Sequence, residues 1–397
     1  MKMGLGLGMS KKTDVSISSD FTSAIPSGFV YTRNDAVTTY RDSSGIMRVA
    51  AIDTPPFDHT AAGVPLGLRF QPGATNKITA YNASPTDTTG ITKIGAGAAG
   101  MVLSIVDDTA ALTAAGLQSV GNAKVIKIDN TSGGGDAGIS FSGTSGNTNS
   151  HVMSMYYRTE TGGAGYISTT NGNGVTVFSH SASYSRLSSA AFTAASNDQM
   201  AILVSNTKIA YIVLPQFEES AILTDPIIVA GSAGTRAAPL LNRSQVWFSE
   251  AGGFSMKYRD EYPRQAVGGL ECLFHLGDGI NDRQTVFKGT GGDLLFKTFS
   301  GGSDTLDYTF DADALAAGPQ GVGMGWKSDL VRCAVNGIEV NTNATVTLPT
   351  SYDFGLSIGT YEGSLFPTNL WLESVTLFRR FPSTAQLEAA TRTILEV

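Results

Sequence analysis

The chain has 397 residues, which is enough for two or three domains because a single hydrophobic core rarely keeps growing beyond about 250 residues. Hydrophobic residues make up 42% of the chain and charged residues only 15%, a composition that excludes global disorder. The net charge is −7 and no run of lysine or arginine exceeds two residues, so the footprint of a nucleic-acid-binding protein is missing and we expect no nucleic-acid partner.

Targeting and membrane signals are weak. The apolar stretch at residues 3–9 is interrupted by three glycines and followed by basic residues, which does not fit a signal peptide. No apolar stretch approaches the roughly 18 residues that span a bilayer. We therefore expect a soluble protein that is made in the cytosol and has no membrane partner.

The two cysteines, Cys272 and Cys333, lie far apart in sequence and inside apolar stretches. We interpret them as reduced core thiols, with a disulfide as the alternative. Two cysteines cannot complete a zinc site by themselves. We expect no metal site and no cofactor.

Residues 1–75 have no sustained periodicity and are punctuated by glycine and proline, for example at Gly28, Pro55 and Pro65. Such a segment cannot bury much surface by itself. We expect it to be extended and to lie along the surface of a neighbouring protein.

Short β-type runs separated by turns characterise residues 76–223. The run at 151–157 places Met153, Met155 and Tyr157 on one face of a strand. Alternation of this kind is typical of a strand with one face in a hydrophobic core.

Two helices are expected. The first covers residues 109–115, with Asp108 as its N-cap and Gly116 after its end. The second follows Ser383, where Gln386 completes a capping-box pattern.

Residues 224–242 are small, contain proline and glycine, and lack alternation, so we place a linker there. A second β-rich region follows at residues 243–397 and closes with the final helix. Within it, Asn336 and Gly337 separate two β-rich runs, which predicts a two-residue hairpin because both turn positions need positive φ. Many short strands with scarcely any helix favour an all-β protein with two consecutive antiparallel β-sandwiches.

Residues 95–100 spell G-x-G-x-x-G, the pattern of dinucleotide-binding turns. Here it leads into a β-type run at residues 101–106 rather than a helix, and no acidic residue stands about 20 positions on. We interpret it as a plain glycine-rich turn.

Catalytic and metal-binding patterns are absent from the sequence. The four histidines lack ligand spacing, and no G-x-S-x-G elbow is present. Residues 277–282 form a polar turn whose oxygens could hold Ca²⁺, but the twelve-residue calcium loop is missing, so we favour a solvated turn. We expect no catalytic residue and no enzymatic activity.

Glycoside hydrolysis is the enzymatic alternative, because a β-sandwich can carry two carboxylates across a scissile bond. The candidate pairs are Asp311 with Asp313 and Asp260 with Glu261. The first pair looks like the polar start of a short helix, and the adjacent acids of the second would face opposite sides of a strand.

Residues 40–45, 55–59 and 66–72 resemble the opening of bacteriophage proteins known as head spikes, head fibres or tail fibres. In that family an extended segment precedes β-sandwich modules. This chain departs from the family pattern at Gln71, where an acid is usual, and at Pro56, where an arginine is usual.

Later stretches carry the same resemblance. Those at 145–151, 184–187, 215–219 and 235–238 are similar to a carbohydrate-binding-module-like jelly roll. The region from residue 246 to 383 resembles a concanavalin-like or laminin-G-like sandwich. The tryptophans, which all lie in strand-like runs, are interpreted as core residues: Trp247, Trp326 and Trp371.

The resemblance implies a structural component of a phage virion, assembled in the host cytoplasm. Its domains would be an N-terminal attachment segment at 1–75, a jelly roll at 76–223, a linker at 224–242 and a laminin-G-like sandwich at 243–397. It implies contacts with other virion proteins, such as capsid, neck or tail proteins, through the N-terminal segment. It also implies a homotrimer.

The alternative function is an adhesin whose jelly-roll loops contact host-surface glycans; a polysaccharide depolymerase is the third possibility. Four tyrosines could supply ring faces for sugar stacking, although a structural role is favoured for each: Tyr156, Tyr157, Tyr166 and Tyr184.

Overall fold

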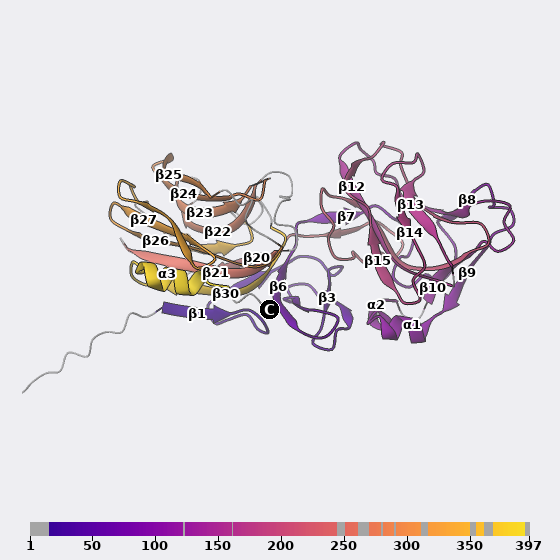
Figure 1. Cartoon of the computed structure of the whole chain (residues 1–397), viewed down its shortest axis with the longest axis horizontal. Coiled ribbons are helices and arrows are strands. Elements are labelled where there is room, and N and C mark those ends of the chain that lie inside the picture. The colour runs from indigo at the N-terminus through magenta and orange to yellow at the C-terminus, as the bar shows by residue number, and fades with distance from the viewer. Residues whose placement is uncertain are drawn as a thin grey trace, which may run out of the picture.

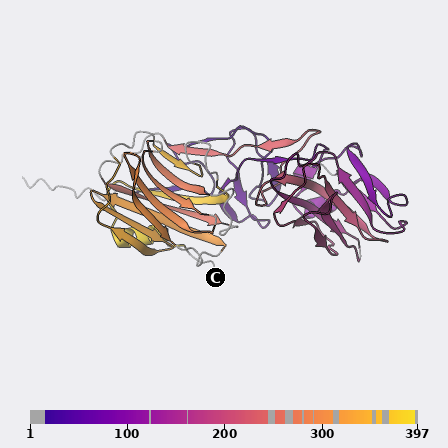
Figure 2. The ribbon, with the colours of Figure 1, turned by 90° about the horizontal axis from the view of Figure 1, so that it is seen from above.

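A computed structural model describes residues 16–121, 124–160, 162–243, 251–260, 270–278, 281–289, 291–310, 317–349, 355–360 and 368–393. These residues form two lobes arranged along the long axis of the molecule (Figures 1 and 2). Each lobe packs two antiparallel sheets over a hydrophobic core. The predicted all-β fold with two consecutive sandwiches is confirmed.

The first lobe packs an eight-stranded sheet on a five-stranded sheet. The larger sheet contains, in spatial order, β15 (Ser185–Ser188), β12 (Ser150–Thr159), β18 (Ile209–Glu219), β10 (Lys124–Asp129) and β9 (Val102–Asp107), with β16 (Phe192–Thr193), β7 (Ala74–Asn76) and β19 (Gly234–Arg236) attached. The smaller sheet contains β14 (Thr176–Phe178), β13 (Gly165–Thr169), β17 (Met200–Val204), β11 (Ala137–Phe141) and β8 (Ile91–Gly95). As predicted, Met153, Met155 and Tyr157 of β12 share one face, and they enter the core between the sheets.

Two short helices, α1 (Thr109–Ala114) and α2 (Gln118–Gly121), cover the outer face of the larger sheet. The first predicted helix is confirmed, and Gly116 follows it with φ +69°. Asp108 makes no side-chain cap bond. Its carboxylate instead accepts hydrogen bonds from Arg158 Nε at 2.6 Å and from the Tyr184 hydroxyl at 2.8 Å, because these stronger donors lie closer to it.

The second lobe packs an eight-stranded sheet on a seven-stranded sheet. The eight-stranded sheet contains β28 (Ile338–Asn343), β27 (Leu330–Val335), β26 (Gly318–Lys327), β21 (Gly252–Asp260), β30 (Leu370–Phe378), β6 (Pro65–Phe70) and β5 (Phe57–His59), with β1 (Ser16–Asp20) attached to β30. The seven-stranded sheet contains β2 (Val30–Thr32), β20 (Leu240–Arg243), β29 (Leu356–Ile358), β22 (Glu271–Asp278), β23 (Asp282–Lys288), β24 (Leu294–Ser300) and β25 (Ser303–Phe310).

Several local predictions hold in this lobe. Trp326 is fully buried in the core, and both cysteines are buried free thiols whose pKa values are raised by burial. The final helix is α3 (Thr384–Thr391), and both bonds of its capping box are present between Ser383 and Gln386.

Residues 16–76 differ from the expected extended segment, because they supply strands to both lobes. β1 and β6 pair one after the other along the same edge of β30, with residues 374–378 and 370–372 respectively. β7 pairs with β18 and β19 of the first lobe. These strands complete sheet edges whose backbone groups would otherwise lack partners, which favours their pairing inside the chain.

The predicted linker is also built into the sheets. β19 pairs with β7, while β20 lies between β2 and β29 in the second lobe. A two-stranded sheet of β3 (Thr39–Arg41) and β4 (Met47–Val49) lies between the lobes in Figure 1. Chain segments from before and after the first lobe therefore meet at the junction and form the walls of a cleft.

Candidate functional site

A cleft of about 410 Å³ opens at the junction of the two lobes. Four separate parts of the chain line it: β3 to β6, β12 with β15 of the first lobe, residues 223 and 225, and β30. Its aromatic side chains are Tyr40, Tyr156 and Trp371, and its charged or titratable side chains are Arg41, Asp58, His59, Arg186 and Asp225. Convergence of rings and polar groups on one concavity is typical of sites that bind small molecules.

Asp58 on β5 fixes one wall of the cleft. Its Oδ1 accepts the backbone N–H groups of Arg41 at 2.7 Å and His59 at 3.0 Å, and its Oδ2 accepts the indole N–H of Trp371 at 2.8 Å. Burial, and then the nearby charge of Asp225, raises the pKa of Asp58 above its ordinary value. The carboxyl group thus holds the indole in place and joins β5 to the last strand.

Asp225 is the second carboxyl group that lines the cleft. Its Oδ2 accepts hydrogen bonds from Arg69 Nε at 3.0 Å and Gln71 Nε2 at 2.7 Å. Burial alone would raise the pKa of Asp225, but the charges of Arg69, Arg186 and Arg236 outweigh burial and lower it. One cleft therefore contains two interacting carboxyl groups whose pKa values are shifted in opposite directions.

Arg186 on β15 lies between the aromatic and acidic parts of the cleft. Its guanidinium donates to the carbonyl oxygen of Thr224 and, at 3.3 Å, to the hydroxyl of Ser154. The same group is 3.9 Å from Asp225 Oδ1 and 5.9 Å from the ring centroid of Tyr156. These contacts fix a half-buried positive charge beside an aromatic ring.

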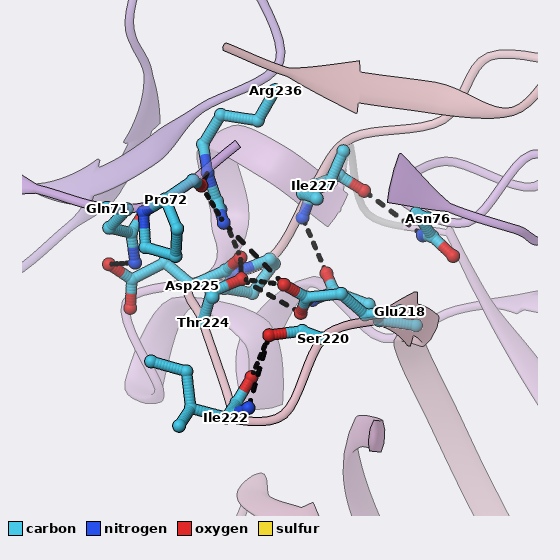
Figure 3. Close-up of polar contacts among 12 residues, drawn as sticks. Gln71, Pro72, Asn76, Glu218, Ser220, Ile222, Thr224, Asp225, Ile227 and Arg236 are labelled. Atoms are coloured by element: carbon cyan, nitrogen blue, oxygen red, sulfur yellow. Dashed lines mark hydrogen bonds and ion pairs between the residues drawn. The ribbon is translucent and has the colours of Figure 1, made fainter. Parts of the chain in front are cut away.

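A buried polar network behind Asp225 supports this part of the cleft (Figure 3). The Thr224 hydroxyl lies 2.7 and 2.8 Å from the two oxygens of Glu218, and Arg236 approaches the same carboxylate at 3.7 Å. Arg236 also donates to the carbonyl oxygens of Pro72 at 3.2 Å and Asp225 at 3.1 Å. Burial raises the pKa of Glu218. The network joins the end of β18 to the two segments that connect the lobes.

The four tyrosines proposed for sugar stacking occupy different environments. Tyr156 lines the cleft but is only 9% exposed and packs in a core cluster beneath the two short helices. Tyr157 packs in the core against Phe178, with ring centroids 4.8 Å apart, and Tyr184 is buried with its hydroxyl on Asp108. Tyr166 is half-buried on the outer face of the smaller sheet, directly across from an exposed valine of β14.

Both acidic pairs considered for glycoside hydrolysis include residues outside the described part of the chain. These residues are Asp311, Asp313 and Glu261; Trp247 and residues 279–280 of the polar turn lie outside it too. Asp260 is 2.9 Å from the ammonium group of Lys288, inside the second lobe.

Among the residues that line the cleft, sequence reasoning proposed Tyr156 for ligand binding but not Asp58, Arg186 or Asp225. Asp58, Arg186 and Asp225 lie far apart along the chain, and no local pattern marks them as partners. The sequence did offer one indirect signal: Asp58 and Arg186 lie inside the stretches 55–59 and 184–187, which resemble the phage proteins.

Within the residues described, no group of three or more histidine, cysteine, aspartate or glutamate side chains is arranged to hold a metal ion. No helix in the same part of the chain is long and apolar enough to cross a bilayer.

Comparisons with known proteins identify no family. No family model and no curated protein matches the sequence. Solved structures that are similar include the NanB sialidase from Streptococcus pneumoniae, at 18% identity and TM-score 0.31, over 36% of this chain and 24% of that one. A second is the Ruminococcus gnavus IT-sialidase CBM40 bound to α2,3-sialyllactose, at 16% identity and TM-score 0.30, over 37% of this chain and 84% of that one. A third is the botulinum neurotoxin serotype D binding domain, at 10% identity and TM-score 0.31, over 38% of this chain and 39% of that one. The match spans only 24% of the first sialidase chain, and no function is transferred from any of these structures.

Proposed function

We propose that this protein is a glycan-binding structural subunit exposed on a bacteriophage particle, and that the cleft between the lobes is its binding site. The observation that carries the proposal is a cleft of about 410 Å³ lined by five charged or titratable side chains and by the half-buried ring of Tyr40, with the buried rings of Tyr156 and Trp371 in its walls. Sugars present apolar ring faces that stack on aromatic side chains and hydroxyl groups that need fixed donors and acceptors. The cleft volume lies within the roughly 300–1,000 Å³ that is usual for small-molecule sites.

Binding rather than catalysis is favoured by the bonding of Asp58. A general acid must offer its proton to the ligand. Each oxygen of Asp58 faces an N–H donor of the protein instead. We therefore propose that the protein is not an enzyme and releases no product from the glycan that it binds.

The phage assignment is supported by the sequence resemblance of residues 40–76 and of the later stretches to phage spike and fibre proteins. On that basis we propose attachment to other virion proteins through the beginning of the chain, a homotrimer, and assembly in the host cytoplasm. Electron microscopy of particles labelled with antibody against this chain tests this part: particles without label would contradict it.

Glycan binding is tested with purified full-length protein on an array of mono- to tetrasaccharides found on bacterial surfaces. We expect a hit whose affinity falls about tenfold in Tyr40→Ala, because loss of ring stacking costs roughly 1–1.5 kcal/mol. Tyr166→Ala is the matched control, since Tyr166 is a half-buried tyrosine outside the cleft. No hit on the array, or loss of binding in the control but not in Tyr40→Ala, would reject the cleft as the site. Release of oligosaccharide from host polysaccharide would overturn the non-catalytic proposal.

A further inference from the structure

A groove of about 430 Å³ on the first lobe shares no lining residue with the cleft between the lobes. It is formed by the connection between β7 and β8, the residue after β11, and Gly231. Its lining includes the ring of Tyr81 and five oxygen-bearing side chains: Thr79, Thr86, Asp87, Thr89 and Ser142.

Tyr81 is unusual among the aromatic residues of the described chain. Its exposed fraction is 38%, whereas every other phenylalanine, tyrosine or tryptophan in those residues is buried or half-buried. The exposed part of the ring contributes nothing to burial on folding, because it stays in contact with water. A ring exposed beside a groove is instead the arrangement that binding sites use for stacking.

The backbone beside Tyr81 is held rigidly. The next residue, Asn82, is 1% exposed, and its amide nitrogen donates to the carbonyl oxygens of Pro215 at 3.2 Å and Ile227 at 3.0 Å. Its side-chain oxygen accepts the N–H of Val229 at 2.7 Å. A ring presented by such an anchored backbone loses little freedom when a ligand stacks on it.

The opposite side of the groove is polar and closely connected. The hydroxyl groups of Thr79 and Ser142 are 2.7 Å apart, and the N–H of Ser142 donates to the carbonyl oxygen of Gly90 at 2.7 Å. Gly90 has φ +77°, and a Cβ atom there would lie 2.7 Å from the Ser142 hydroxyl oxygen. Glycine at this position therefore keeps the hydroxyl pair accessible from the groove.

The charge of the groove selects among ligands. Asp87 is its one charged lining residue, and the backbone hydrogen bond from Thr89, at 2.7 Å, lowers the pKa of its carboxyl group. An anionic sugar would be repelled by this carboxylate, with no lysine or arginine among the lining residues to offset the repulsion. A neutral sugar would present its ring face to Tyr81 and its hydroxyl groups to the threonines and serine.

We propose that the groove around Tyr81 is a second saccharide site, separate from the cleft and selective for an uncharged pyranose. The site does not depend on the cleft, so either proposal can fail alone. The ligand class is set by one exposed ring, a row of hydroxyl groups and one carboxylate.

The experiment uses the full chain and saturation-transfer NMR with neutral mono- to trisaccharides of glucose, galactose, mannose and N-acetylglucosamine, and with the matching uronic acids. We expect at least one neutral saccharide to bind, with an affinity about tenfold lower in Tyr81→Ala and nearly unchanged in Tyr81→Phe, because phenylalanine keeps the ring face. The uronic acids should bind more weakly than their neutral counterparts. Thermal melting confirms that both variants are folded.

Three outcomes would overturn the proposal: no neutral saccharide binds, Tyr81→Ala binds as the parent does, or the uronic acids bind more tightly than the neutral sugars. Tyr40→Ala distinguishes the two sites. Binding of a neutral saccharide that is lost in Tyr40→Ala but kept in Tyr81→Ala belongs to the cleft. If every saccharide that binds behaves in this way, the second outcome applies and the groove is not a saccharide site.

Discussion

At the scale of single residues, the carboxylate of Glu219 joins two separate segments of the first lobe. Glu219, at the end of β18, lies 2.7 Å from the ammonium group of Lys77 and accepts a hydrogen bond from Asn149 at 2.6 Å. The Lys77 contact first, and then the Asn149 bond, lower the pKa of Glu219 from 4.5 to about 2. The two contacts connect the segment after β7 and the turn before β12 to the same carboxylate.

The lowered pKa of Glu219 predicts that the free energy of unfolding depends on pH. Because the pKa of Glu219 is lower in the folded than in the unfolded protein, its contribution is fully present above about pH 4.5 and is lost as the pH falls toward 2. We expect Glu219→Gln to reduce the free energy of unfolding by about 0.5–1 kcal/mol at pH 7, since the pair is partly exposed, and to flatten its decline between pH 4.5 and 2. Urea denaturation at pH 7, 5 and 3 measures both effects. An unchanged slope in acid would contradict the assignment.

At the scale of elements, the hairpin of β27 and β28 shows how a turn is adapted to its surroundings. Asn336 and Gly337 have φ +50° and +83°, as a two-residue hairpin of this kind requires. The Asn336 side chain accepts the N–H of Gly321 and donates to Gln320, both at 2.7 Å. The turn is therefore also attached to β26, and a Cβ atom at Gly337 would lie 3.1 Å from Arg392.

We expect Gly337→Ala to reduce the free energy of unfolding by about 1–2 kcal/mol, because an L-residue is strained at this φ. Gly134→Ala is the control: its φ is not in the left-handed region and its Cβ would meet nothing within 4 Å, so the change should stay within about 0.5 kcal/mol. Equilibrium urea denaturation compares the two variants. Equal losses would show that the turn geometry does not limit stability.

At the scale of the whole molecule, two crossing segments couple the lobes. One leads from β6 of the second lobe to β7 of the first, and the other returns from β19 to β20. Arg236 lies where they meet, is 1% exposed, and donates to the carbonyl oxygens of Pro72 and Asp225. Because these bonds are buried, the lobes should unfold together and the cleft should keep its shape without a ligand.

The coupling is tested with Arg236→Ala. Trp326 on β26 and Trp371 on β30 lie in the second lobe and no tryptophan lies in residues 76–236, so tryptophan fluorescence reports mainly the second lobe, whereas far-UV circular dichroism reports both. We expect the two urea transitions to coincide in the parent protein and to separate in the variant, with a loss of about 3–5 kcal/mol, because Glu218 is left buried without its arginine. Lys124→Ala, at an exposed ion pair with Asp107 within the first lobe, should leave them coincident. Coincident transitions in Arg236→Ala would show that this contact does not couple the lobes.

The sequence by itself determined the class of fold and several local elements. Alternation at residues 151–157, the Asn336 and Gly337 turn, and the capping box at Ser383 and Gln386 each predicted what the structure contains. These signals can be read locally, because side-chain alternation, positive φ and end-capping depend on residues a few positions apart.

Tertiary structure alone decided where residues 16–76 belong and what forms the cleft. The strands of that segment have three to six residues, too few for a period to show, and their partners lie as far away as β30. In the same way, Asp58 meets Trp371 across 313 positions and Arg69 meets Asp225 across 156. Such contacts follow from which strands pair and in which register, and pairing depends on the whole core rather than on any short stretch of sequence.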